Sequence, residues 1–218
     1  MVQAASPRLG RPRDPALRAR RRQEILDAAM YVFAERGYPE TDLEVVGARA
    51  GVSKGSVYRY FRSKAALFLA TVDHGMKQLT AVIEAQRNLQ GDALDSIARA
   101  IRAYLEFFEQ HPAFVELLIQ ERAQFRHRKK PTYFRHREAN LGPWRELIGD
   151  LIQKGRMRDI PVERITTVVG DLLYGTMFTN YFAGRKRAVD EQLTDILDIV
   201  WHGILGERER GRPRGNNC

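Results

Sequence analysis

The sequence predicts an all-α protein of about nine helices, with an N-terminal three-helix head and a larger helical domain behind it. Apolar residues recur at helical spacing along most of the chain, whereas strand-type alternation is scarce and Asn-Gly or Asp-Gly hairpin signals are absent. Capping and breaking residues separate these periodic segments. We therefore divide the chain into a basic arm (1–19), a head (20–66), a helical domain (67–206) and a basic tail (207–218).

The head contains three predicted helices, each marked by its own end signals. The first covers 20–36 and is ended by Gly37. Thr41, with Glu44 three residues later, forms a capping box that opens a second helix over 42–50. Gly51 ends that helix, and Ser53 caps a third that runs to about Phe61.

The rest of the chain reads as six or seven further helices. Serine or aspartate caps open the first two, and prolines open the next ones. Gly142-Pro143 kinks or splits the segment that begins at Pro131. The predicted ranges are 64–90, 92–111, 112–126, 131–154 with its second part at 144–154, 161–182 and 189–205.

Composition excludes several classes of protein and site. The 218 residues are 44% hydrophobic and 29% charged, without an apolar run near the ~20 residues of a membrane span, and the basic N-terminal segment lacks the apolar stretch of a secretory signal. We therefore expect a cytoplasmic protein. The one cysteine, Cys218, permits no internal disulfide, and no histidine has metal-ligand spacing. No phosphate loop, nucleophile elbow or acid/base pair is present, so we expect no catalytic residues, no metal and no cofactor.

The net charge of +9 is concentrated at the two ends of the chain. Residues 1–22 hold seven arginines and one acidic residue, and residues 207–218 hold four arginines and two glutamates. A basic arm on a nearly neutral body is typical of proteins that bind the phosphate backbone of nucleic acids. A solvated basic tail would show the same charge pattern, so charge alone leaves both open.

The most informative segment is 41–64, TDLEVVGARAGVSKGSVYRYFRSK. Two short helices joined by a tight turn match a helix-turn-helix, in which the second helix enters the major groove of DNA. Gly47 allows close crossing of the two helices, and Gly51 supplies the positive φ of the turn. Their shared core is predicted to contain Val46, Val52, Val57 and Phe61.

The second helix of this motif has an apolar face and a face suited to DNA. At 100° per residue, Val57 and Phe61 lie opposite Gly55 and Arg59. Arg59 can contact a guanine through two hydrogen bonds, and tyrosine hydroxyls and lysines can contact phosphates. The predicted DNA contacts within the motif are Thr41, Ser53, Lys54, Gly55, Ser56, Tyr58, Arg59, Tyr60 and Lys64.

Residues 50–67, AGVSKGSVYRYFRSKAAL, closely resemble the signature of TetR-family transcriptional repressors. The resemblance extends upstream through 25–37 and Thr41. Two positions depart from the family pattern: Asp42 stands where a small hydroxyl residue is usual, and Gly47 where alanine is frequent. The resemblance implies a repressor that binds a palindromic operator as a homodimer and is released by a small-molecule effector.

Both arms carry the same short motif, Gly-Arg-Pro-Arg, at 10–13 and 211–214. Arginine in an extended Gly-Arg-Pro frame suits the narrow minor groove, so Arg11 and Arg13 are predicted DNA contacts. The C-terminal copy resembles an AT-hook core, but a solubilising tail is the stronger interpretation. If both arms bind DNA, the protein could instead be a ligand-independent architectural DNA-binding protein.

For the second domain, the resemblance implies dimerisation through the last two helices, each of which has an apolar stripe. A plain core within the chain is the alternative for these stripes and for the aromatic side chains, which could also surround an apolar or aromatic effector. The predicted dimer residues are Ile165, Val169, Leu172, Leu173, Thr176, Leu193, Ile196, Leu197, Val200 and Ile204. The predicted effector-pocket residues are Tyr104, Phe107, Phe108, Phe114, Leu118, Glu121, Phe125, Trp144, Leu147, Tyr174, Phe178 and Tyr181.

Overall fold

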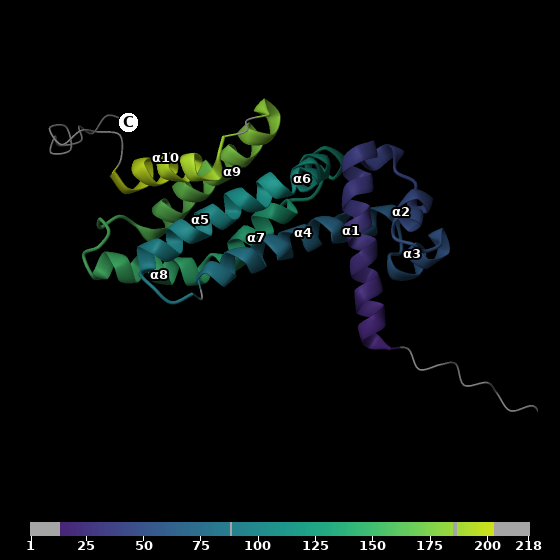
Figure 1. Ribbon diagram of the computed structural model, residues 1–218, viewed down its shortest axis with the longest axis horizontal. Helices are drawn as coiled ribbons and strands as arrows, with labels where there is room; N and C mark the ends of the chain where they lie inside the picture. The colour runs from purple at the N-terminus through teal and green to yellow at the C-terminus, as the bar shows by residue number, and fades with distance from the viewer. Residues whose placement is uncertain (1–13, 88, 185–186, 203–218) are drawn as a thin grey trace, which may run out of the picture. The chain divides into compact units, whose positions relative to one another are not determined.

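The computed structural model describes residues 14–87, 89–184 and 187–202, which form ten α-helices and no strand (Figure 1). The predicted all-α fold is confirmed. None of these helices is long and apolar enough to cross a membrane. The helices are α1 (Pro15–Glu40), α2 (Leu43–Arg49), α3 (Lys54–Tyr60), α4 (Lys64–Arg87), α5 (Ala93–Gln110), α6 (Pro112–Gln124), α7 (Thr132–Asn140), α8 (Gly142–Gln153), α9 (Val162–Ala183) and α10 (Val189–His202).

The chain divides after Thr71 into two compact units. The first contains α1, α2, α3 and the first two turns of α4. In the second, α5 packs against α6, α9 and α10, while α9 also packs against α6 and α8. The division falls within α4, which begins before Thr71 and ends after it.

Helix α1 is longer at both ends than the predicted 20–36. Asp14 is its N-cap and accepts a hydrogen bond from the Ala16 amide at 2.9 Å, and Pro15 occupies the first turn. The prediction missed this start because it treated the arginine-rich stretch as an extended arm. Gly37 interrupts the helix with a φ of 79°, as its position predicts, and a short helical turn then reaches Glu40.

The cap of α2 corrects the predicted capping box. Asp42 accepts a hydrogen bond from the Glu44 amide at 2.9 Å, so this aspartate is the N-cap. Thr41 is buried, and its hydroxyl donates to the Gly37 carbonyl at 2.7 Å. The residue that departs from the family pattern therefore does the capping, and the helix starts one residue later than predicted.

The predicted reasons for the two glycines of the motif are confirmed. Gly51 has a φ of 66°, in the left-handed region. A Cβ added at Gly47 would lie 2.7 Å from the Val52 carbonyl oxygen, so only glycine fits without a backbone shift. Val46, Val57 and Phe61 are buried, as predicted, and Val52 is half-buried.

In the second unit, most predicted helix starts are correct and several ends differ. Asp92 caps α5 by accepting from the Leu94 amide at 2.8 Å, and Pro112 occupies the first turn of α6. Gly142-Pro143 separates α7 from α8, which raises the count to ten. Helix α4 ends at Arg87 rather than residue 90, and α8 begins at Gly142 rather than residue 144.

Gly75 allows α4 to approach α6 closely. A Cβ at this position would lie 2.4 Å from the ring of Phe114, which is fully buried and ring-stacked with Phe108. The ring has no open space to move into, because Phe107 also packs against it. The second unit therefore depends on glycine here.

We expect Gly75→Ala to lower the free energy of unfolding by about 1–3 kcal/mol, the usual cost of overpacking a core. Gly149→Ala in α8 is the matched control, since a Cβ there meets nothing within 4 Å. Alanine at that position should be neutral or stabilising by about 0.5–1 kcal/mol through helix propensity. Urea unfolding measures both, and equal stabilities of the two variants would contradict the close contact.

Candidate nucleic-acid interface and ligand cavity

Helix α3 turns one face into the first unit and leaves the other exposed. Val57 is completely buried, whereas Lys54, Gly55, Arg59 and Tyr58, the last at 48% exposure, face outward. A Cβ at Gly55 would have no neighbour closer than 4.0 Å, so the surface beside this glycine is open. Four of the predicted DNA contacts thus share one accessible face.

A chain of hydrogen bonds orients the guanidinium of Arg59. Its Nη2 donates to the Ser56 hydroxyl at 3.1 Å, and that hydroxyl lies 3.1 Å from the Ser53 hydroxyl. Ser53 is also the N-cap of α3 and accepts from the Ser56 amide. These two serines therefore position the arginine, which retains further N–H donors for a ligand.

The carboxylate of Asp42 lies beside this surface and is tolerated there because its charge is paired. It forms an ion pair with Lys54 at 2.8 Å. The hydrogen bond from the Glu44 amide, followed by the one from Lys54, lowers the pKa of Asp42 below its ordinary value. The pair holds the lysine at the start of α3, close to where its charge could meet a phosphate.

Two predicted DNA contacts have structural partners within the first unit. Thr41 is buried, as described above, and its hydroxyl is engaged by Gly37. The Lys64 ammonium donates to the carbonyls of Pro39 at 2.8 Å and Thr41 at 3.2 Å, and lies over the ring of Tyr38. Tyr60 is half-buried. Arg11 and Arg13 lie outside the described residues, as do both Gly-Arg-Pro-Arg motifs.

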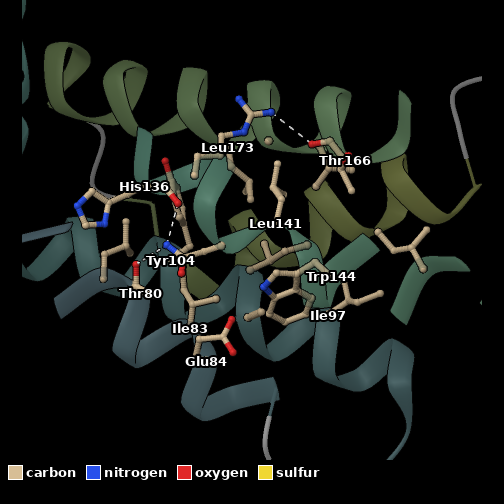
Figure 2. A pocket seen from close by; sticks show the side chains of 18 of the residues that line it. Thr80, Ile83, Glu84, Ile97, Tyr104, His136, Leu141, Trp144, Thr166 and Leu173 are labelled. Atoms are coloured by element: carbon tan, nitrogen blue, oxygen red, sulfur yellow. Dashed lines mark hydrogen bonds between the residues drawn. The ribbon is translucent and has the colours of Figure 1, made fainter. Parts of the chain in front are cut away.

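The second unit contains a cavity of about 200 Å³ lined by residues of α4, α5, α7, α8, α9 and α10 (Figure 2). Its lining is mainly apolar, and both tryptophans of the chain contribute to it. The apolar lining residues are Met76, Leu79, Ile83, Ile97, Ala100, Ile101, Leu141, Trp144, Ile148, Met157, Ile165, Val169, Leu173 and Trp201. The remaining ones are Thr80, Glu84, Tyr104, Tyr133, His136, Arg137, Asn140, Thr166 and Gly170.

Of the predicted pocket residues, Tyr104 and Trp144 line this cavity and the others do not. Glu121 is 2% exposed and accepts hydrogen bonds from the Thr132 amide and hydroxyl, so it holds the start of α7. Three predicted dimer residues line the cavity instead. The predicted pocket residues outside it are Phe107, Phe108, Phe114, Leu118, Glu121, Phe125, Leu147, Tyr174, Phe178 and Tyr181.

Sequence reasoning missed the contributions of α4 and α7 to the cavity. On α4, Met76, Leu79, Thr80 and Ile83 recur at i, i+3, i+4 and i+7, a spacing that identifies one helix face. This stripe could have been found from the sequence. The α7 residues gave no such signal, because they sit in a highly charged segment that resembles a solvated loop.

The polar groups of the cavity have partners on neighbouring helices. Nε2 of His136 lies 2.8 Å from the Asp73 carboxylate on α4. Arg137 donates to Asp171 at 2.7 Å and to two carbonyls of α9. It fits over Gly170, where a Cβ would lie 2.3 Å from the guanidinium. The cavity wall thus links α7 to both α4 and α9 through paired charges.

Two buried tyrosines face each other in the same wall. The hydroxyls of Tyr104 and Tyr133 are 3.0 Å apart. Burial raises the pKa of Tyr133 to about 12 and that of Tyr104 well above its ordinary value of 10.0. Both phenols are therefore neutral hydrogen-bonding groups at any physiological pH.

Two more of the eight tyrosines in the chain share this property: burial raises the pKa of Tyr174, and burial with the hydrogen bond to Glu116 raises that of Tyr181 to about 12. In an alkaline titration, ultraviolet absorbance should therefore show four phenols ionising late, and Tyr133→Phe should remove one of them. Because the folded chain holds these protons more tightly than the unfolded chain, their contribution to stability is complete below pH 10.0. It is lost as the pH rises from there towards about 12. A single transition for all eight would contradict the burial.

One face of α9 remains exposed and apolar. Val168, Leu172, Gly175 and Phe182 recur at i, i+4, i+7 and i+14, and Val168 and Phe182 are 62% and 69% exposed. A Cβ at Gly175 would meet nothing within 4 Å. On α10, Ile199 is also exposed. A soluble chain rarely exposes such a stripe without a partner to cover it.

The predicted dimer residues separate into distinct groups. Leu172 belongs to the exposed stripe, and Thr176, Leu197 and Val200 are half-buried. Leu193 and Ile196 are buried within the chain, and Ile165, Val169 and Leu173 line the cavity. Ile204 lies outside the described residues. No group of three or more metal-ligating side chains occurs in the described part of the chain.

Comparison with known proteins places these features in one family. Residues 25–71 match the model of bacterial regulatory proteins of the tetR family. An uncharacterized HTH-type transcriptional regulator of Mycobacterium tuberculosis is 33% identical over 210 residues, 92% of this chain and 95% of that protein.

Two further similarities are informative. The HTH-type transcriptional activator FasR of Mycolicibacterium smegmatis is 30% identical over 103 residues, and this match spans 47% of each chain. The structure of FadR from Bacillus subtilis, solved with stearoyl-CoA, has a TM-score of 0.68 at 20% identity and covers 84% of this chain and 99% of that one. The motif at 41–64, the ten-helix fold and the near full-length relative agree: the chain belongs to the TetR family of DNA-binding transcriptional regulators.

Proposed function

We propose that the protein is a repressor that binds a palindromic operator as a homodimer and is released by an apolar small molecule. The observation that carries the DNA-binding part is the exposed face of α3, where Lys54, Gly55, Tyr58 and Arg59 lie together over a buried Val57. A helix of this kind inserts into the major groove, and its arginine and tyrosine supply base and phosphate contacts. Binding to genomic DNA would place the protein at the bacterial nucleoid.

The exposed α9 stripe supports the homodimer. A twofold interface brings the same surface of two chains together, so a self-complementary apolar stripe is what such an interface needs. Gly175 in the middle of the stripe would allow two α9 helices to approach closely. Two heads related by twofold symmetry would read the two halves of a palindrome.

The lining of the cavity supports an apolar effector. Most of its lining residues are aliphatic or tryptophan side chains, and its charged groups are paired: His136 and Arg137 with carboxylates of neighbouring helices, and Glu84 with Arg87 on α4 itself. The FadR structure was solved with stearoyl-CoA, whose acyl chain is apolar, as we propose for the effector of this chain. By analogy we assign a linear alkyl amphiphile to the cavity of this chain.

Helix α4 supports a route from effector to DNA. Met76, Leu79 and Ile83 line the cavity, and the same helix begins at Lys64 in the first unit. His136 of the cavity wall is paired with Asp73, two residues beyond the boundary between the units. A ligand that displaces α4 or breaks this pair would change the spacing of the two heads, and operator affinity would fall.

Recovery of bound genomic fragments by the full-length protein tests the proposal. We expect a short palindrome to be enriched and its occupancy to fall when a linear fatty acid is added. Sequence-independent, strongly salt-dependent binding that persists in Arg59→Ala would contradict it and favour an architectural protein. Tighter binding in the presence of the fatty acid would contradict release by the effector.

A further inference from the structure

A second cavity lies behind the wall of the first. It has a volume of about 530 Å³, is lined by residues of α5, α6, α9 and α10 together with Gly184 and Arg187, and opens to solvent on one side. Tyr104 lines both cavities, and no other residue does. The boundary between the two spaces is therefore formed around one side chain.

The two cavities follow each other along α5. Ile97, Ala100, Ile101 and Tyr104 line the first one, at i, i+3, i+4 and i+7. From Tyr104 onward, residues of the same helix line the second. These residues are Leu105, Phe108 and Glu109.

Helix α9 shows the same succession. Ile165, Val169 and Leu173 line the first cavity, and Met177, with the residues after it, lines the second. Since α5 and α9 pack against each other, both helices carry one lining stripe from the first cavity into the second. The two spaces are thus arranged end to end, with Tyr104 at the junction.

The ring of Tyr104 is held at this junction by contacts from both sides. It is 5% exposed, and its hydroxyl pairs with Tyr133 of the first cavity and lies 3.9 Å from the sulfur of Met177 of the second. Its ring packs 4.9 Å from that of Phe108, again in the second cavity. The buried side chain of Tyr104 is therefore held in place between the two cavities, where it acts as a partition.

The second cavity is apolar next to the partition and polar further away. Leu105, Phe108, Val115 and Met177 are buried, whereas Glu109, Gly184 and Arg187 are exposed and mark its solvent side. A chain that passed Tyr104 would therefore first meet hydrocarbon. This is the lining that the end of an alkyl tail requires.

We propose that Tyr104 is a specificity-determining residue that sets the longest alkyl chain accepted by the first cavity, and that the second cavity is a tail subsite closed off by its ring. The inference rests on the proposed function, because it assumes that the first cavity takes a linear alkyl amphiphile. Removing the ring would join the two cavities into one channel. Tyr104→Phe would keep the partition, because it removes only the hydroxyl.

The experiment measures the affinity of saturated linear carboxylates, from octanoate to octadecanoate, for the full-length protein. The only two tryptophans, Trp144 and Trp201, line the first cavity, so quenching of their fluorescence reports its occupancy. In the wild type and in Tyr104→Phe, affinity should rise with chain length and then level off. In Tyr104→Ala, it should continue to rise by about fourfold for each further methylene, the equivalent of about 0.8 kcal/mol.

Two further variants keep the result interpretable. Phe107→Ala removes another buried ring of α5 that lines neither cavity, so it should keep the wild-type plateau. Tyr104→Ala combined with Val115→Phe refills part of the second cavity without adding a tryptophan, and it should restore the plateau. If Tyr104→Ala does not fold, Tyr104→Leu takes its place.

The outcomes separate the two proposals. A wild-type plateau that is unchanged in Tyr104→Ala overturns the partition while leaving the effector class intact. If Phe107→Ala also accepts longer carboxylates than the wild type, the proposed role of Tyr104 is overturned too, since the effect would then come from a loosened core. Failure of every carboxylate to bind the wild type overturns the proposed effector class, and the partition with it.

Discussion

Gly55→Glu is expected to abolish operator binding while leaving the chain folded. A side chain at this position meets no protein atom closer than 4.0 Å, so glutamate fits without a clash. A negative charge in the first turn of α3 also favours the helix. The same charge on the DNA-facing surface would oppose phosphates, and like-charge juxtaposition costs several kcal/mol. We expect affinity to fall on the order of 100-fold or more, measured by fluorescence anisotropy with the recovered operator.

Gly149→Glu provides the control for this change. It introduces the same side chain at another helical glycine whose Cβ position is open, on α8 of the second unit. Operator affinity should stay within about twofold of the wild type, because surface substitutions of this kind cost little. Equal losses in both variants would show that net charge, and not the α3 face, determines binding.

Gly175→Glu is expected to separate the homodimer into folded monomers. The position is open within the chain and lies in the middle of the exposed α9 stripe. Glutamate has the higher helix propensity, so the monomer should be stabilised by about 0.5–1 kcal/mol. In a twofold interface, however, the charge is buried twice without a partner, at a cost of several kcal/mol. The dimer dissociation constant should rise on the order of 1000-fold.

Sedimentation velocity measures the assembly, with Gly149→Glu again as the control that should stay dimeric. Operator binding by Gly175→Glu should weaken in parallel with dissociation and recover at high protein concentration. A variant that remains dimeric would show that α9 does not supply the interface. The comparison with Gly55→Glu is informative, because that variant should remain a dimer and still fail to bind DNA.

The DNA-binding motif could be predicted from the sequence because its signals are local. Turn glycines, the Ser53 cap and the apolar positions act within a few residues of each other, and α3 lies where its cap placed it. The errors arose where two residues competed for one role. Thr41 and Asp42 both suit an N-cap, and only the fold decides that Thr41 turns inward to Gly37.

Beyond the α4 stripe, the lining of the cavity could not be predicted, because it depends on how helices distant in the sequence pack. Aromatic side chains at helical spacing suit a core and a pocket equally well, and the rings of Phe107, Phe108 and Phe114 pack on one another without lining the first cavity. The apolar residues of α9 likewise lie on two different faces of the helix. Leu173 turns inward to the cavity and Leu172 outward, a distinction of 100° that periodicity alone does not resolve.

Footprinting of the full-length protein on a recovered operator fragment, with and without a linear fatty acid, tests the central claim most directly. The proposed function predicts two protected half-sites, with the spacing of about one helical turn that is usual for helix-turn-helix dimers, which become accessible together when the fatty acid is bound. Gly55→Glu should give no protection in either condition. Protection that spreads over the fragment without regard to sequence, or that no fatty acid of the series alters, would contradict an effector-released repressor.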